Sequence, residues 1–223
     1  MLAERLLSDF IASMSIEQAM QVYLCRILSL VKLRSFETAY QELKALSHLD
    51  RPELFYEYYP ETFPGRKGSM IPFSVRVISA SLPHLLGNTS ESLNELAHLQ
   101  VHLRGILAAL DKDASLVSPE LKEAAKEIWT TREAKLSLMI VNHLYNLKDY
   151  QLATEVMQDI VRKHPDNVVY QSALGRLYLQ VGNISEAKQV FLHLRGVCQG
   201  NPKLATLIAI NEYHSLFLLS KNM

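Results

Sequence analysis

The sequence predicts an all-α protein built from helical hairpins, and three observations support this prediction. First, Leu174–Leu194 reads L-G-x-x-Y, then a Gly-Asn break, then A-x-x-x-F, which is the signature of the tetratricopeptide repeat (TPR). Second, a step of 34 residues back from Ala187 reaches Ala153, in a stretch with the same pattern. Third, the same turn recurs around Ala39 and Ser92 at irregular spacing. The predicted fold class is therefore an all-α, TPR-like helix-turn-helix solenoid with irregular repeats.

Residues 1–50 are predicted to hold N-terminal helices and a first degenerate repeat. Leu2, Leu6 and Phe10 fall on one side of an N-terminal helix. Ser35 is a strong N-cap type, and Ala39 follows it at the point where two helices cross. A small residue at this crossing point lets the two helix backbones approach closely.

Residues 51–118 combine an aromatic, Pro- and Gly-rich segment with a second degenerate repeat, in which Asn88 is the predicted cap and Ser92 the crossing residue. We expect the aromatic segment either to fold back and fill the gap between repeats or to dock a partner, since Tyr is favoured at interfaces. Its candidate partner-binding residues are Phe55, Tyr56, Tyr58, Tyr59 and Phe63.

Residues 119–200 are predicted to form two well-formed TPR repeats. The Ser-Pro-Glu sequence that begins at Ser118 is typical of a helix start, and the pattern stays helical to about Leu147. The two repeat turns carry the cap residues Asp149 and Asn183, each followed four residues later by an alanine.

Residues 201–223 are predicted to be the first helix of an incomplete further repeat. The segment Lys203–Leu219 follows a Gly-Asn-Pro break and is rich in Leu and Ile. An apolar helix without a partner helix needs a cover, which a second protein can supply. Leu216 and Leu219 are therefore candidate partner-binding residues.

The first helices of the two best repeats are predicted to line a concave groove. Grooves of this kind bind extended peptides. Asn142 and Arg176 occupy equivalent positions there, where they either hold a peptide backbone or carboxylate or only solvate the face. The predicted groove-facing residues are Lys135, Leu138, Asn142, Tyr145, Asn146, Val169, Ser172, Arg176 and Gln180.

Composition argues against several classes of partner. The chain carries 23 Lys+Arg and 23 Asp+Glu, so we expect neither nucleic-acid binding nor a polybasic membrane surface. The longest apolar stretch, Leu204–Leu219, is interrupted by polar residues, so we expect no direct membrane insertion. Cys25 and Cys198 have no metal-site or disulfide spacing, and the N-terminus has no signal-peptide pattern, which together favour a cytoplasmic protein.

Signatures of catalysis are weak along the whole sequence. His98 and His102 lie four residues apart, but the glutamate that a zincin requires after its first histidine is missing. The GRKGS sequence at Gly65–Ser69 places its basic residues before the second glycine, unlike a P-loop. We therefore expect no enzyme activity, no catalytic or metal-binding residue and no cofactor.

Several of these segments also resemble a known family. The stretch RPELFYEYYPETFPGRKGSMIPFSVRV, followed by LGNTSESLNEL, is similar to the region that opens the TPR domain in the subunit 12 family of the TRAPP tethering complexes. The resemblance continues through LKDYQLATEVMQDIVRKHP and LGRLYLQVGNISEAKQVF and covers roughly Ser47 to Ser220.

This resemblance implies a non-catalytic scaffold subunit of the metazoan TRAPPIII complex, which is a guanine-nucleotide exchange factor for a Rab GTPase. The implied roles are ER-to-Golgi vesicle transport, Golgi organisation and autophagy. The implied partners are other TRAPP subunits, especially the large subunit 11, and indirectly the Rab GTPase and early secretory membranes. The implied location is cytoplasmic, peripheral to the ER-Golgi intermediate compartment and the Golgi.

Two alternatives remain open at this point. A free TPR adaptor of the co-chaperone type would bind short acidic peptide tails through Asn142 and Arg176. An enzyme with a dispersed active site would instead reveal itself by a tightly bound metal or nucleotide.

Overall fold

The computed structural model describes residues 16–45, 49–112, 119–197 and 210. Within these ranges the regular structure is helical, apart from one isolated antiparallel bridge between Phe55 and Ser69. The predicted fold class, an all-α TPR-like solenoid, is confirmed. The chain divides into two compact units, residues 1–99 and 100–223. Leu2, Leu6 and Phe10 of the predicted N-terminal helix lie outside the described residues, as does the predicted helix Lys203–Leu219 apart from Ile210.

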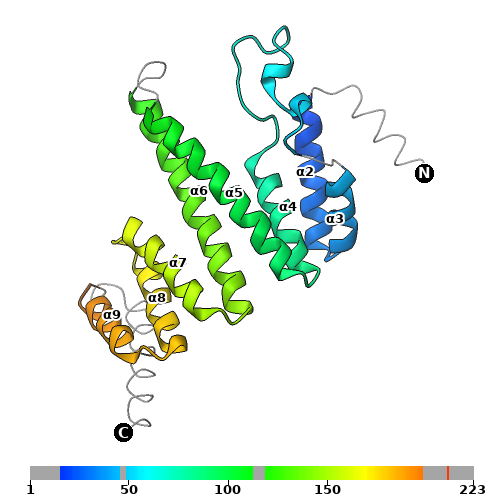
Figure 1. The fold of residues 1–223 in the computed structure, drawn as a ribbon. Coiled ribbons are helices and arrows are strands. Elements are labelled where there is room, and N and C mark those ends of the chain that lie inside the picture. Colours follow the sequence, from blue (N-terminus) through cyan, green and yellow to red (C-terminus); the bar gives the residue numbers. More distant parts are fainter. Residues whose placement is uncertain (1–15, 46–48, 113–118, 198–209, 211–223) are drawn as a thin grey trace. The chain divides into compact units, whose positions relative to one another are not determined.

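The helices are joined in hairpins (Figure 1). The first unit contains α2 (Ile16–Lys32), α3 (Phe36–Ala45), the short 3-10 turns η1 (Pro52–Leu54) and η2 (Tyr56–Tyr58), and α4 (Phe73–Leu85). Helix α5 (Thr89–Lys112) begins in the first unit and continues into the second. The second unit continues with α6 (Pro119–Asn146), α7 (Tyr150–Lys163), α8 (Val168–Val181) and α9 (Ile184–Val197).

Four of the helix-to-helix turns share one backbone design. In each turn a residue with left-handed φ follows the first helix, and its N–H donates to the carbonyl three residues earlier. The N–H of the next residue donates to the carbonyl five residues earlier, which completes a Schellman-type C-cap. The left-handed residues are Arg34 (φ 59°), Gly87 (φ 91°), Lys148 (φ 62°) and Gly182 (φ 86°).

The residue after each left-handed position starts the second helix, as the sequence predicts. The side-chain oxygens of Asn88, Asp149 and Asn183 accept hydrogen bonds from the N–H three residues on, at 3.3, 3.1 and 3.5 Å. These bonds satisfy N–H groups that a helix start otherwise leaves without a partner. The four predicted crossing residues, Ala39, Ser92, Ala153 and Ala187, are all fully buried at 0% exposure.

The core of the first unit surrounds the α2–α3 hairpin. Ile27 and Leu43 from the hairpin pack in one cluster with Val75 and Leu82 of α4. Ser92 can be buried beside this core because its hydroxyl donates a 2.6 Å hydrogen bond to the carbonyl of Ala80. The crossing position therefore accepts serine without an unsatisfied polar group.

Helix α6 has 28 residues, whereas α7, α8 and α9 have 14 each. The helix predicted from the Ser-Pro-Glu start to about Leu147 is therefore present with nearly the predicted bounds, although Ser118 itself lies outside the described residues. At 1.5 Å per residue α6 is about 42 Å long. Contacts join α6 to α7, α7 to α8, and α8 to α9 in sequence.

The α8–α9 hairpin shows why the repeat signature has its spacing. Ala187, Phe191 and Leu194 form one buried cluster at 0% exposure. A Cβ atom added at Gly175 would lie 2.7 Å from the Phe191 ring. Phe191 therefore occupies the space that a side chain at position 175 would need, and the two signature residues depend on each other.

Candidate functional site

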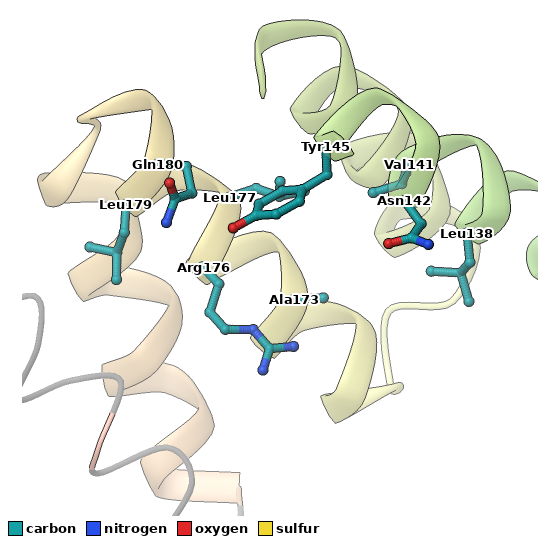
Figure 2. A pocket seen from close by; sticks show the side chains of 9 residues that line it. All are labelled: Leu138, Val141, Asn142, Tyr145, Ala173, Arg176, Leu177, Leu179 and Gln180. Atoms are coloured by element: carbon teal, nitrogen blue, oxygen red, sulfur yellow. The ribbon is translucent and has the colours of Figure 1, made fainter. Parts of the chain in front are cut away.

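A hollow of about 420 Å³ lies between α6 and α8 in the second unit. Figure 2 shows Asn142 and Tyr145 reaching toward it from α6, while Arg176 and Gln180 stand on the facing helix α8. The volume falls within the range of about 300–1,000 Å³ that is common for ligand sites. The lining residues are Leu138, Val141, Asn142, Tyr145, Ala173, Arg176, Leu177, Leu179 and Gln180.

The walls of this hollow are held by buried residues. Val141 of α6 is 9% exposed and Leu177 of α8 is 5% exposed, so buried side chains form the base of the hollow. The Tyr145 ring meets the Tyr150 ring edge to face, with centroids 5.3 Å apart, and remains 41% exposed. The polar side chains of the hollow therefore lie beside tightly packed, buried side chains, which is the kind of support that a binding surface requires.

The structure places most of the predicted groove residues together. Of the nine, Leu138, Asn142, Tyr145, Arg176 and Gln180 line the hollow. Lys135, Asn146 and Val169 are exposed but do not line it. Ser172 is 2% exposed rather than groove-facing, because neighbouring groups cover its side chain, whereas Arg176, one turn later, is exposed. Whether the hollow binds a partner stays a prediction.

An ion network around the buried Glu133, which the sequence analysis missed, connects three helices of the second unit. The Glu133 carboxylate of α6 accepts hydrogen bonds from Lys163 of α7 at 2.8 Å and from Arg104 of α5 at 3.1 Å. Lys163 also pairs with Asp159 at 3.1 Å. The i,i+4 spacing of Asp159 and Lys163 is visible in the sequence, but their pairing with Glu133 and Arg104 is not, since those residues lie on other helices whose packing only the fold defines.

The network sets the ionisation of Glu133. Burial alone would raise the pKa of this carboxyl, but the hydrogen bonds from Lys163 and Arg104 outweigh burial and hold the pKa below its ordinary value. Burial alone would lower the pKa of Lys163, but its hydrogen bonds to Glu133 and Asp159 outweigh burial and raise this pKa above its ordinary value. Both groups therefore stay charged at neutral pH and fix α5, α6 and α7 to one another within the second unit.

The aromatic segment of the first unit is an ordered loop. The Phe55–Ser69 bridge is extended by hydrogen bonds from the Tyr56 N–H to the Gly68 carbonyl at 3.0 Å and from the Met70 N–H to the Leu54 carbonyl at 2.8 Å. Leu54 packs against the core of the first unit. The loop is thus anchored at its base; whether it fills a gap between repeats or docks a partner stays a prediction.

The side chains of this loop pack mainly on one another. The rings of Tyr56 and Phe63 meet edge to face at 5.2 Å, and the Arg66 guanidinium lies 4.4 Å from the Tyr56 ring centroid. Tyr59 stacks edge to face on Tyr58 at 5.0 Å, and Tyr58 is 53% exposed. Phe55, Tyr56, Tyr59 and Phe63 are partly buried, which leaves Tyr58 as the most accessible of the five candidate residues.

Three further observations concern candidate residues and chemistry. Leu216 and Leu219, the other partner-binding candidates, lie outside the described residues. In the part of the chain that the structure describes, no group of three or more His, Cys, Asp or Glu side chains is placed to hold a metal ion. No helix in those same ranges combines the length and the apolar character that crossing a membrane requires.

Comparison with known proteins identifies similar sequences. The family model described as Tetratricopeptide repeat matches residues 144–210. A mouse protein named Trafficking protein particle complex subunit 12 is 34% identical over 211 residues, which is 92% of this chain and 26% of the mouse protein. The human protein of the same name is 36% identical over 188 residues, 81% of this chain and 26% of its own length. The chain therefore spans about a quarter of the length of these relatives.

Proposed function

We propose that this chain is a non-catalytic scaffold within a trafficking protein particle complex. The proposal rests on its similarity to the subunit 12 proteins, of whose length it matches about a quarter. The observation that carries the proposal is the extent of the similarity. The repeat model matches only residues 144–210, whereas the similarity to the mouse and human proteins covers 92% and 81% of the chain. Generic repeat positions alone do not account for a match of that extent.

The finer part of the proposal concerns which complex and which pathway. The chain serves the TRAPPIII form of the complex, which promotes guanine-nucleotide exchange on a Rab GTPase, and it contributes contacts rather than catalytic residues. Its main partner is the large subunit 11. It acts in ER-to-Golgi transport and autophagy from the cytoplasmic side of ER-Golgi intermediate and Golgi membranes.

The surface of the second unit carries apolar side chains that are candidate contacts for other subunits. Several large apolar side chains point to solvent on different helices, including Val101 at 69% exposure, Leu121 at 64% and Val169 at 62%. A scaffold subunit needs such side chains because apolar contact drives most protein association. Rigid helical hairpins present them at fixed positions.

Affinity capture tests this proposal. The tagged chain is expressed in human cells and captured, and the co-purifying proteins are quantified by mass spectrometry. We expect TRAPP subunits, with subunit 11 prominent among them. Recovery of chaperones without any TRAPP subunit would contradict the proposal and favour a free TPR adaptor.

A matched control distinguishes proteins captured by the folded chain from proteins that adhere to the chain when it is unfolded. Phe191→Asp buries a charge in the fully buried α8–α9 cluster and unfolds that hairpin. If TRAPP subunits are captured equally by this variant, their recovery does not report a scaffold contact of the second unit.

A further inference from the structure

We propose that the far end of the α5–α6 hairpin docks an amphipathic helix of a partner protein, and that one flank of this partner helix is basic. The inference goes beyond the scaffold role, because it assigns a surface and the chemistry of its partner without depending on which complex the chain serves. It rests on three observations: the hairpin extends past α7, it exposes an apolar stripe there, and one flank of the stripe is acidic.

Helices α5 and α6 run antiparallel within the second unit, and their contacts fix the register. Arg104 of α5 pairs with Glu133 of α6 at 3.1 Å, and further along Asp111 pairs with Lys126 at 3.0 Å. Helix α7 ends at Lys163, whose ammonium group reaches the same Glu133 carboxylate at 2.8 Å. The part of α6 that precedes Glu133 therefore extends past the end of α7 (Figure 1).

This distal part of α6, residues 119–132, exposes an apolar stripe. Leu121, Ala125 and Ile128 recur at i, i+4 and i+7, so their side chains lie on one face of the helix. Leu121 is 64% exposed and Ile128 is 53% exposed, and the small Ala125 between them lets another helix approach closely. The same spacing joins the helices of a coiled coil. The stripe therefore fits a partner helix of about three turns.

The two flanks of the stripe differ in charge. On one flank Lys122 faces α5, where its ammonium group donates to the Asp111 carbonyl at 3.3 Å. Glu120 and Glu127 each precede a large residue of the stripe by one position, so they lie about 100° around the helix on the other flank. Both glutamates are exposed, and neither forms an ion pair or a hydrogen bond with another residue in the described ranges. A docked helix with Lys or Arg on that side complements this charge.

The acidic flank also argues against two other occupants of the stripe. An anionic membrane surface attracts basic segments, and Glu120 and Glu127 would be repelled by it. In an antiparallel pair of copies of this chain, a two-fold axis would place the two acidic flanks against each other. A different polypeptide with a basic flank avoids both repulsions.

The test is selection of helical peptides against the full chain. The displayed peptides have about 20 residues, with Leu at the a and d positions of the heptad and with the flanking positions varied among Lys, Gln and Glu. Selected peptides are resynthesised with a fluorescent label, and their affinity is measured by anisotropy at low and high salt.

Two surface variants form a matched pair. Ile128→Gln removes a large side chain from the stripe, and Val169→Gln is its control because Val169 is 62% exposed on α8. Circular dichroism checks that both variants remain folded.

We expect the selection to enrich Lys over Glu on one flank of the peptide. Ile128→Gln should weaken binding about tenfold or more, as expected when the partner helix no longer buries a large apolar side chain. Val169→Gln should leave binding unchanged.

Reversal of the acidic flank tests the charge directly. The double variant Glu120→Lys with Glu127→Lys should weaken binding of the Lys-flanked peptide, with a smaller effect at high salt, and should prefer the Glu-flanked form of the same peptide. Non-specific adhesion of a Leu-rich helix would not produce this exchange of preference.

Four results would overturn the proposal. They are no enriched peptide, enrichment without a preference for Lys, binding that survives Ile128→Gln in full, and self-association of the chain that Ile128→Gln abolishes while no peptide binds. The last result would assign the stripe to a second copy of this chain. Each result is independent of TRAPP membership, because the assays contain only this chain and the peptides.

Discussion

Replacing Gly175 by Val should destabilise the second unit through the Phe191 ring. A Cβ at position 175 would lie 2.7 Å from two ring atoms of Phe191, about 1 Å closer than the 3.5–4.0 Å at which carbon atoms pack favourably. Phe191 is 0% exposed and packs with Ala187 and Leu194, so the ring cannot turn out into solvent to relieve the contact. Overpacking of this kind costs about 1–3 kcal/mol, and the gain in helix propensity from replacing Gly returns only a few tenths of a kcal/mol.

The preceding hairpin supplies a compensating variant. At the positions 34 residues earlier, Val141 stands for Gly175 and Met157 stands for Phe191, and both are buried. In that hairpin the larger residue on the first helix, Val141, is thus matched by a narrower residue on the second helix, Met157. The double variant Gly175→Val with Phe191→Met should recover part of the loss, with a coupling energy of about 1–3 kcal/mol.

The assay is urea unfolding followed by tryptophan fluorescence. The chain contains a single Trp, Trp129, and it lies on α6 in the same unit as the α8–α9 hairpin. Gly105→Val is the matched control, because Gly105 is also inside a helix but an added Cβ there meets nothing within 4 Å. Equal stability of Gly175→Val and Gly105→Val, or strict additivity in the double variant, would refute the reasoning.

Three other perturbations test separate parts of the structure. Ala187→Leu should lower the free energy of unfolding by about 1–3 kcal/mol, because it overpacks the fully buried helix crossing. Gln189→Leu, on the exposed face of the same helix, should have no such effect. Equal melting temperatures of the two variants would show that the crossing residue is misassigned. Asp149→Ala should lower the free energy of unfolding by about 0.5–2 kcal/mol, because it removes the cap hydrogen bond from the Leu152 N–H. Asp149→Asn keeps a side-chain acceptor and should be close to wild type in stability. An Ala variant as stable as the wild type would argue against the cap. The pKa of Glu133 is lower in the folded than in the unfolded state, so its stabilising effect is present above the unfolded-state pKa and is lost as pH falls through the folded-state pKa. Lowering the pH should therefore reduce the free energy of unfolding of the wild type more than that of Glu133→Gln. Equal losses of stability in the two proteins from pH 7 to pH 3 would contradict this.

The repeat turns could be predicted because their information is local. A cap residue and a small residue four positions later are fixed by the geometry of a helix start and of a helix crossing, and both are visible in sequence. The left-handed residues were harder to predict. Gly87 and Gly182 are typical of such a position, but Arg34 and Lys148 adopt it as well, since two C-cap hydrogen bonds hold the backbone there.

The groove could be predicted in part, because repeat spacing shows which residues share the first-helix face. Asn142 and Arg176 are equivalent by spacing, and both line the hollow. The burial of each side chain could not be predicted, since it depends on which neighbouring groups cover it in the fold, as Ser172 shows. The Glu133 network and the internal packing of Tyr56, Phe63 and Arg66 also depend on contacts that no periodicity encodes.

The central claim, that this chain is a scaffold segment of a TRAPP complex, is tested most directly by exchange. In human cells that lack subunit 12, the matching quarter of the human protein is replaced by this chain, and size-exclusion chromatography measures whether the chimera co-elutes with the other TRAPP subunits. Our account predicts co-elution, which is lost when the chimera carries Phe191→Asp. A folded chimera that elutes apart from the complex would contradict the account.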